Sequence, residues 1–202
     1  MSDKQTERRA QIETAAFAVL EKVGYKKASM LQIAKQAKAS NETLYAWYGN
    51  KQTLFSNLIS ANAGMVEDAL NAAIEGDNNS EDTLLAVARL LLQFTATDKA
   101  IIINRAAVAD VQDTGLLAKA IEENARQVMY RKLESLMGKL AASGQYHFDS
   151  TPSEAAQVFV SLVIGELQMQ QALGSIAPLT DEEIAKRAKK ACAFFARVYR
   201  SA

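Results

Sequence analysis

The side chains best suited to contact with another molecule gather in one short stretch, residues 40–48. It has the sequence S-N-E-T-L-Y-A-W-Y, and its amide, carboxylate, hydroxyl and aromatic groups can donate or accept hydrogen bonds or stack. Ser40 is a typical helix N-cap, and Leu44 and Tyr48 stand four residues apart, on the inner side of a short helix. The polar and aromatic residues then point outward, so the sequence predicts a contact face.

A second short helix is predicted directly before this stretch. Ser29 and Gln32 form a capping box, in which the hydroxyl accepts from a free backbone N–H and the Gln side chain reaches back. The inward residues of this helix recur at a spacing of three and four; they are Met30, Ile33, Ala34 and Ala37. The pattern breaks at Lys38, which predicts a turn of about three or four residues. Two such helices form a helix-turn-helix unit, whose second helix enters the major groove of DNA.

A wider set of spaced residues around this unit carries a family resemblance. The set comprises Gly24-Tyr25, Ala28-Ser29-Met30, Ile33-Ala34, Ala37, Ser40, Thr43-Leu44-Tyr45, Tyr48, Asn50-Lys51 and Leu54-Phe55. Over about residues 11–58 the chain resembles the N-terminal domain of the tetracycline-repressor (TetR) family of bacterial one-component regulators. The resemblance implies base-edge contacts from Asn41, Glu42 and Tyr45. It implies phosphate contacts from Thr43, Trp47 and Lys51.

The chain departs from the family pattern at positions that include Lys38 and Trp47. Lys38 stands where the family usually has Gly, which implies a non-Gly residue at positive φ at a cost of order 1 kcal/mol. Trp47 stands where His is common, and its indole can donate one hydrogen bond but carries no charge. Family members often send a basic N-terminal extension to the DNA; a frayed, solvated terminus is the alternative here. The residues expected at the DNA are Lys4, Arg8, Arg9, Ser29, Gln32, Ser40, Asn41, Glu42, Thr43, Tyr45, Ala46, Trp47 and Lys51.

The composition predicts an all-α protein of about nine helices. The chain has 202 residues, 49% of them hydrophobic, with only two Pro and nine Gly, and no sustained alternation typical of strands. The helices are expected over about residues 7–23, 29–37, 40–48, 50–74, 80–96, 97–108, 114–142, 151–173 and 180–199. We expect residues 1–51 to form a helix-turn-helix DNA-binding domain. Residues 52–202 are expected to form a helical effector-binding and dimerisation domain.

The charge is divided between the two ends of the chain. The net charge is zero, but residues 1–51 hold nine Lys and Arg against five Asp and Glu, and the remainder holds 14 against 18. The positive part carries the predicted contact face, as attraction to phosphates requires.

The last two predicted helices are too apolar to stand uncovered in a chain of this size. The helix ending near residue 173 is apolar around most of its circumference, and the final helix has a broad apolar face. We expect two copies of the pair to form a four-helix interface in a homodimer. The expected interface residues are Val158, Phe159, Leu162, Val163, Phe194, Phe195 and Val198. The C-terminal half also resembles the AefR-type regulatory domain, through residues that include Ala109-Asp110, Gly165 and Val198-Tyr199-Arg200, and this resemblance implies a two-fold dimer.

Polar residues within apolar stretches of the C-terminal half indicate a pocket. A buried polar group needs a partner, which a small-molecule effector could supply; pairing with one another, with the backbone or across the dimer is the alternative. The candidates are Gln93, Asn104, Arg105, Tyr130, Glu166 and Gln170, with Met169 as adaptable lining.

The sequence predicts neither catalysis nor a cofactor or metal. His147, the single His, stands in a predicted surface turn, and Cys192, the single Cys, on the apolar side of the last helix, so no catalytic set or metal-ligand spacing can be assembled. Without an apolar run near 18 residues or a leader, we expect a soluble cytoplasmic protein with no membrane contact. The predicted function is a ligand-responsive transcriptional repressor that binds a partly palindromic operator as a homodimer. The alternatives are a sensor or adaptor that has lost operator binding, and an all-α enzyme using a C-terminal cavity.

Overall fold

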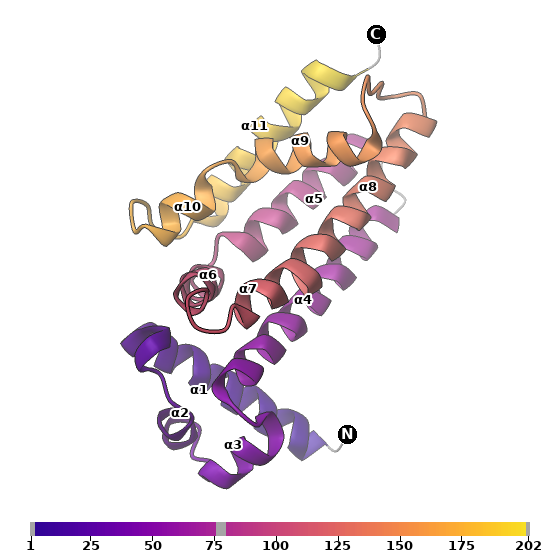
Figure 1. Cartoon of the computed structure of the whole chain (residues 1–202). Coiled ribbons are helices and arrows are strands. Elements are labelled where there is room, and N and C mark those ends of the chain that lie inside the picture. Colours follow the sequence, from indigo (N-terminus) through magenta and orange to yellow (C-terminus); the bar gives the residue numbers. More distant parts are fainter. Residues whose placement is uncertain (1–2, 76–79, 201–202) are drawn as a thin grey trace. The chain divides into compact units, whose positions relative to one another are not determined.

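The computed structural model describes residues 3–75 and 80–200, and most of them are helical (Figure 1). The helices are α1 (Asp3–Lys27), α2 (Met30–Gln36), α3 (Asn41–Tyr48), α4 (Lys51–Glu75), α5 (Ser80–Thr95), α6 (Asp98–Asp110), α7 (Leu116–Ala120), α8 (Gln127–Ala142), α9 (Pro152–Ile164), α10 (Leu167–Ala172) and α11 (Asp181–Tyr199). A π-helical segment, η1 (Ile121–Arg126), joins α7 to α8. The described residues form no β-strand, only an isolated bridge between Tyr146 and Arg200. The all-α prediction is confirmed.

Two of the predicted helices are interrupted, so the described residues form more helices than the nine expected. The stretch 114–142 holds α7, η1 and α8, and it begins after Gly115, whose left-handed φ of 66° precedes the first helical residue. The stretch 151–173 divides at Gly165, where φ is 51° and ψ is −130°, a conformation that strains any residue with a side chain. The apolar periodicity continues through both interruptions, which is why it did not predict them.

The helices pack into two compact units. Unit 1 consists of Met1–Asn62 with Ile102–Glu122, and unit 2 of Ala63–Ile101 with Glu123–Ala202. By packing, the beginning of α4 and most of α6 therefore belong to unit 1. The expected boundary after residue 51 separates a DNA-binding domain from an effector-binding domain, and it stays a prediction.

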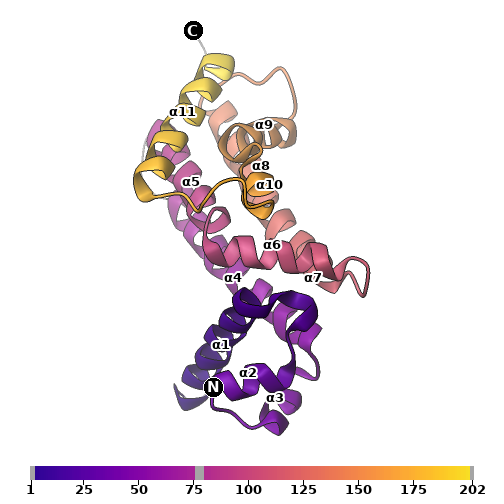
Figure 2. The same cartoon turned by 90° about the vertical axis from the view of Figure 1, so that its left-hand side faces the viewer.

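Each unit has its own apolar core. The largest fully buried side chains of unit 1 are Ile12, Ile33, Leu44, Leu54, Phe55 and Leu117. Figure 2 shows α1, α2 and α3 of this unit packed together. In unit 2, α5, α8, α9 and α11 pack on one another around Leu91, Leu133, Phe159 and Phe195. The two helices on either side of the predicted turn are thus fixed on a core that α1, α4, α6 and α7 complete.

Candidate nucleic-acid interface

Side-chain caps fix where α2 and α3 begin. The Gln32 N–H donates to Ser29 Oγ at 3.3 Å, and the Ser29 N–H donates to Gln32 Oε1 at 2.9 Å. The Thr43 N–H donates to Ser40 Oγ at 3.0 Å. Both predicted caps are confirmed, and they set the helix beginnings to within one residue.

Helix α3 has one buried side and one exposed side. Leu44 and Tyr48 are buried in the core of unit 1. The exposed residues are Asn41, Glu42, Tyr45 and Ala46. Half of the Tyr45 surface (50%) is accessible, so its phenol ring points away from the core. The outward side of α3 therefore presents amide, carboxylate and phenol groups together.

Two further predicted contact residues of α3 are partly buried. Thr43 Oγ1 lies 2.8 Å from Ser40 Oγ, so the two hydroxyls share a hydrogen bond within the cap. The Trp47 ring lies edge-on to Tyr48, with the ring centroids 6.4 Å apart, and the Arg9 guanidinium lies 5.9 Å from the Trp47 centroid. A guanidinium over an indole face is attracted to it. Arg9 thus places beside Trp47 the positive charge that the indole lacks.

The three basic residues near the start of the chain that were predicted to contact DNA have different surroundings. The side chain of Lys4 lies outside the described residues. Arg9 is exposed beside Trp47. Arg8 turns toward the loop between α2 and α3, where its guanidinium donates to the carbonyls of Ala37 at 3.1 Å and Lys38 at 2.5 Å. Sequence reasoning missed this contact because nothing local to residue 8 indicates a partner 30 residues away.

The predicted phosphate ligand Lys51 is engaged inside unit 1. Its Nζ donates to the Tyr25 carbonyl at 2.8 Å and lies 4.2 Å from the centroid of the Tyr25 ring. Burial lowers the pKa of the Lys51 ammonium, and the charges of Asp110 and Asp113 act in the opposite direction. Asn50 caps α4 as predicted, with Oδ1 accepting from the Thr53 N–H at 2.8 Å. A phosphate contact from Lys51 stays a prediction, and it would share the ammonium with the Tyr25 carbonyl.

A fully buried acid, Asp110, lies in unit 1 and was assigned no role from the sequence. One of its carboxylate oxygens accepts from Thr114 Oγ1 at 2.8 Å and from the Leu117 N–H at 3.3 Å. Burial and then the nearby Asp110 raise the pKa of the Tyr25 hydroxyl, which therefore stays protonated. Asp110 thus fixes the turn between α6 and α7 and balances the charge around Lys51. The Asp-to-Thr spacing of four was the available signal, because such short side chains often bond within a turn.

The polar residues predicted to line an effector pocket lie mostly at the surface. Those exposed are Gln93, Arg105, Glu166, Met169 and Gln170, and those partly buried are Asn104 and Tyr130. The expectation of burial is wrong for the first group, because their helices turn these positions outward. A role in effector binding stays a prediction for all of them.

Gln171, next to a predicted residue, is the buried amide of this region. It is 1% exposed, and its Nε2 donates to the carbonyls of Ala96 at 3.4 Å and Ala177 at 3.3 Å. Gln171 therefore ties α10 to the end of α5 and to the segment before α11, all within unit 2.

The predicted subunit-interface residues separate into two groups. Phe159, Val163 and Phe195 are fully buried in the core of unit 2, so they do not form its surface. Val158 and Leu162 are half-buried, whereas Phe194 and Val198 are 42% and 66% exposed. Neighbouring apolar residues on one helix point to different sides, and the apolar pattern alone did not separate them. Only the second group remains available for contact with another chain.

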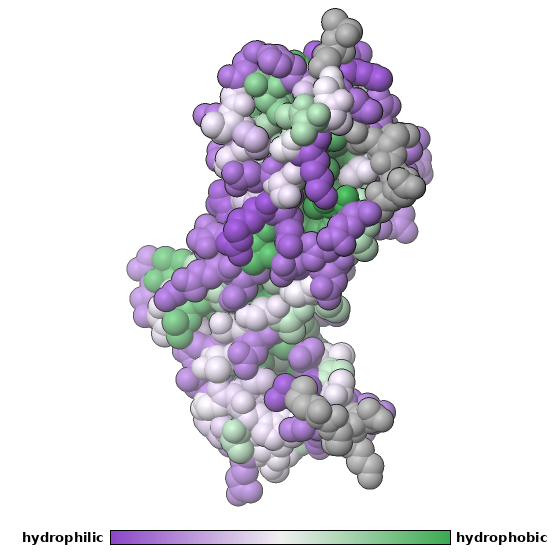
Figure 3. Space-filling model, turned by 90° about the vertical axis from the view of Figure 1, so that its right-hand side faces the viewer, coloured by the Kyte–Doolittle hydropathy of each residue, from purple (hydrophilic) through white to green (hydrophobic). Residues whose placement is uncertain are grey.

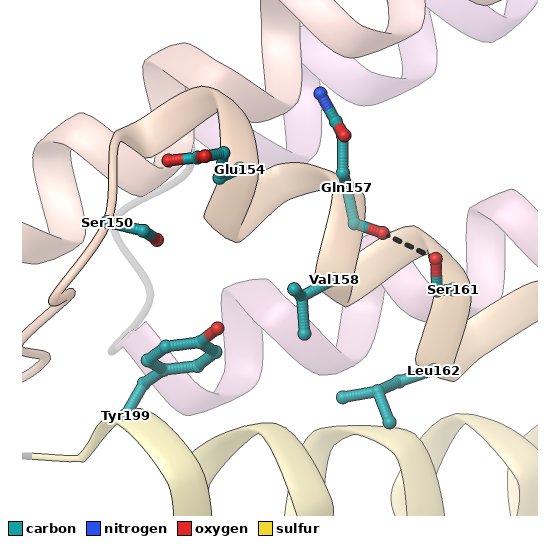
Figure 4. A pocket seen from close by; sticks show the side chains of 7 residues that line it. All are labelled: Ser150, Glu154, Gln157, Val158, Ser161, Leu162 and Tyr199. Atoms are coloured by element: carbon teal, nitrogen blue, oxygen red, sulfur yellow. Dashed lines mark hydrogen bonds between the residues drawn. The ribbon is translucent and has the colours of Figure 1, made fainter.

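A surface hollow of about 600 Å³ lies beside Val158 and Leu162 (Figure 4). Its lining residues are Ser150, Glu154, Gln157, Val158, Ser161, Leu162 and Tyr199. Figure 4 shows Val158 and Leu162 of α9 facing α11, which carries Tyr199; Glu154, Gln157 and Ser161 also lie on α9, and Ser150 lies on the segment before it. The hollow therefore combines an apolar floor with hydrogen-bonding groups, and only Val158 and Leu162 were predicted to lie at an interface.

Apolar side chains are exposed in other places as well. On the face drawn in Figure 3, hydrophobic residues form patches between hydrophilic ones. In unit 1, Val108, Val111 and Leu116 are 70%, 55% and 45% exposed. Apolar exposure is thus not confined to α9 and α11.

The lone His and the lone Cys show no sign of chemistry. His147 is exposed, with Nε2 3.2 Å from Asp149 Oδ1, and burial raises the pKa of the Cys192 thiol to about 11. A protonated thiol is a poor nucleophile. Among residues 3–75 and 80–200, no three His, Cys, Asp or Glu side chains gather as metal ligands, and no helix has the length and apolarity to span a bilayer.

Comparisons with known proteins bear on both parts of the chain. Residues 12–58 match the family model described as bacterial regulatory proteins of the tetR family. Residues 82–201 match the model described as the C-terminal domain of AefR-like transcriptional repressors. No curated protein sequence matches the chain significantly.

Solved structures share the fold over nearly the whole chain. A tetR-family regulator from Mesorhizobium loti MAFF303099 has a TM-score of 0.84 at 22% identity, covering 99% of this chain and 100% of its own. The flavonoid-responsive regulator FrrA has a TM-score of 0.69 at 28% identity, covering 96% and 98%. A TetR regulator from Agrobacterium tumefaciens has a TM-score of 0.71 at 26% identity, covering 100% and 96%. The arrangement described above is therefore a known fold.

Proposed function

This chain belongs to the tetR family of bacterial regulatory proteins, with an AefR-like C-terminal domain, and we propose that it is a ligand-responsive repressor that binds a partly palindromic operator as a homodimer. The observation that carries the proposal is α3, a capped helix anchored by Leu44 and Tyr48 whose outward side is polar and exposed. Family members are generally DNA-binding regulators and not enzymes. This chain is therefore proposed to bind its effector without converting it, in the cytoplasm where the DNA lies.

Helix α3 is proposed to lie in the major groove of the operator. An amide such as that of Asn41 can pair with adenine, and a carboxylate such as that of Glu42 can accept from cytosine. Tyr45 adds a phenol donor and an aromatic face at the centre of the exposed side. Arg9, which lies over the Trp47 ring, is proposed to bind a phosphate, because its positive charge is attracted to the DNA backbone. The exposed caps Ser29 and Ser40, with Gln32, Thr43 and Ala46, are proposed to lie along the DNA backbone.

Two chains are proposed to pair through the outward sides of α9 and α11. Phe194 and Val198 of α11 leave apolar surface in water, and Val158 and Leu162 of α9 line the hollow that Tyr199 of α11 also lines. Covering such surface contributes about 25 cal/mol for each Å² removed from water. A two-fold pair would present two copies of α3 to half-sites roughly 34–36 Å apart, one turn of the duplex.

The effector is proposed to be a small organic molecule bound by unit 2. FrrA is named for its response to flavonoids and shares 28% identity with this chain, so planar phenolic compounds are the first to test. A ligand can change operator binding only if it binds one conformation of the dimer more tightly than the other. The expected effect is reciprocal, because DNA then weakens ligand binding by the same factor.

The proposal is tested by selecting duplexes from a random-sequence library with the full-length protein. The selected duplex should be preferred over a shuffled duplex of equal composition. Tyr45→Ala should weaken binding to the selected duplex by roughly 1–3 kcal/mol and blur the preference, because it removes a contact to a base edge. Tyr45→Phe is the control that keeps the ring and removes only the hydroxyl. Equal affinity of the wild-type protein for both duplexes would overturn the proposal in favour of a sensor without an operator.

A further inference from the structure

Arg8 of α1 is bonded to the turn that separates α2 from α3. Its Nη1 donates to the Ala37 carbonyl at 3.1 Å and its Nη2 to the Lys38 carbonyl at 2.5 Å. Nη1 also donates to Gln11 Oε1 at 2.7 Å, one helical turn along α1. The fork of the guanidinium is thus aimed at two successive carbonyls of the turn.

The turn itself ends α2 in a conformation that usually requires Gly. The Lys38 N–H donates to the Lys35 carbonyl at 3.2 Å, and the Ala39 N–H donates to the Ala34 carbonyl at 2.9 Å. These two bonds define a Schellman motif, in which the residue after the C-cap adopts left-handed φ. Here that residue is Lys38, with φ of 51°, and it is the non-Gly residue with positive φ among the described residues. The side chain of Lys38 therefore makes the turn strained where Gly would leave it relaxed.

The position of Arg8 offsets this strain in two ways. The carbonyls of Ala37 and Lys38 lie beyond the last turn of α2, where helix carbonyls lack intrahelical partners, and the guanidinium supplies donors to both. Its positive charge also lies at the C-terminal end of α2, which is the negative end of the helix dipole. Ser40, the N-cap of α3, follows two residues after Lys38, so the shape of the turn sets the direction in which α3 leaves.

We propose that Arg8 is a positioning residue for α3, which holds the strained turn closed and so aims the exposed side of the helix, and that it is not a phosphate ligand. This inference rests on the proposed function, and it replaces the role predicted for Arg8 from the sequence. It assigns the phosphate contacts of this part of the chain to other residues, among them Arg9 beside Trp47.

The dependence of binding on salt separates the two roles of Arg8. Each phosphate neutralised by a cationic side chain contributes about 0.9 to the slope of log affinity against log salt. Arg8→Ala should lower affinity for the library-selected duplex roughly tenfold or more, leave affinity for the shuffled duplex nearly unchanged, and keep the wild-type salt slope. Arg8→Lys should also lose specific affinity, because a single ammonium cannot bond two carbonyls as a planar fork does. A slope reduced by about one phosphate in Arg8→Ala, with weaker binding to both duplexes, would overturn the inference.

A second variant tests whether Arg8 affects DNA binding through the turn at Lys38. In a Lys38→Gly background the turn no longer needs the guanidinium, so adding Arg8→Ala should cost a smaller factor in affinity than it costs the wild-type protein. Slopes are compared with that of Lys38→Gly, which itself removes a charge. Circular dichroism and thermal unfolding of each variant exclude loss of folding as the cause. An undiminished loss in the Gly background would overturn the inference, whereas failure of the wild-type protein to prefer the selected duplex would instead overturn the proposed function.

Discussion

The two helix pairs proposed to make contacts, α2 with α3 and α9 with α11, both bury side chains in the core of their unit but differ in the further contacts that position them. Helices α2 and α3 have 7 and 8 residues, and caps, a strained turn and Arg8 position them. Helices α9 and α11 have 13 and 19 residues, and aromatic rings fix them together. The ring centroids of Phe159 on α9 and Phe195 on α11 are 5.2 Å apart, and the Tyr199 ring of α11 lies 4.9 Å from that of Phe195 on the same helix.

In the first pair, the contacts that set the direction of α3 are separate from the core of unit 1, whereas in the second pair the rings that join the two helices are themselves part of the core of unit 2. A directed hydrogen bond contributes about 0.5–1.5 kcal/mol to stability, whereas truncating a buried ring costs about 3–5 kcal/mol. The proposed DNA-contacting face can therefore be displaced while unit 1 stays folded. The proposed pairing face cannot be displaced without loosening the core of unit 2.

Phe195→Ala tests the aromatic packing between α9 and α11, and it should give the largest effect because the ring is fully buried. The ring contacts those of Tyr146, Phe148, Phe159 and Tyr199. Its removal should lower the free energy of unfolding by about 3–5 kcal/mol in denaturant titrations. Phe194→Ala, one position along and 42% exposed, is the matched control and should change the free energy of unfolding of the monomer by no more than about 1 kcal/mol. Similar losses for both would mean that the core does not distinguish the two sides of α11.

The same contrast explains which features the sequence could predict. The caps of α2 and α3 and the buried Leu44 and Tyr48 depend on residues close together in the chain, and they were predicted from those residues. The positive φ of Lys38 was implied by the family resemblance, and it is confirmed. The fork of Arg8 depends on a partner 30 residues away, and no local pattern contains it.

In unit 2 the apolar pattern predicted the helices but not which side of each helix is buried. Val158 and Phe159 are apolar and adjacent in the chain, yet Phe159 is buried and Val158 lines a hollow. Which side faces inward depends on how α5, α8, α9 and α11 pack, and that is a property of the whole unit. Phe159→Glu would therefore not test pairing, because it would place a charge in the core of unit 2 and unfold the unit.

Val198→Glu is the sharper test of pairing, with an intermediate expected effect. Val198 is 66% exposed, so a carboxylate there stays in water in one chain but would be buried between two. Dimer formation should weaken by roughly 2 kcal/mol or more, measured by sedimentation over a concentration series, with little change in thermal unfolding of the monomer. Val108→Glu, at an equally exposed Val of unit 1, is the matched control and should still dimerise. Loss of the dimer in both variants, or in neither, would count against the α9 and α11 interface.

The capping boxes extend the comparison to pH, with the smallest expected effect. Helix α2 closes its box with Gln32, which does not titrate, whereas α9 and α11 use Glu154 and Glu183. The backbone N–H of Thr151, followed by its hydroxyl, lowers the pKa of Glu154, and Thr180 lowers that of Glu183 in the same way. A carboxyl whose pKa is lower in the folded chain stabilises it above the unfolded pKa, about 4.3, and loses that contribution as the pH falls through the folded value.

Acid should therefore loosen the beginnings of α9 and α11 while that of α2 stays closed. The expected result is that amide exchange protection at Thr151 and Thr180 falls relative to that at Ser29 as the pH drops below about 4. Exchanging the capping residues makes the test reciprocal, because Glu183→Gln should remove the acid response at Thr180 and Gln32→Glu should create one at Ser29. Both variants keep an acceptor for the N-cap N–H, so the ability to titrate is the difference that is measured. An acid response at Thr180 that persists in Glu183→Gln would show that the aromatic core, and not the cap, controls the beginning of α11.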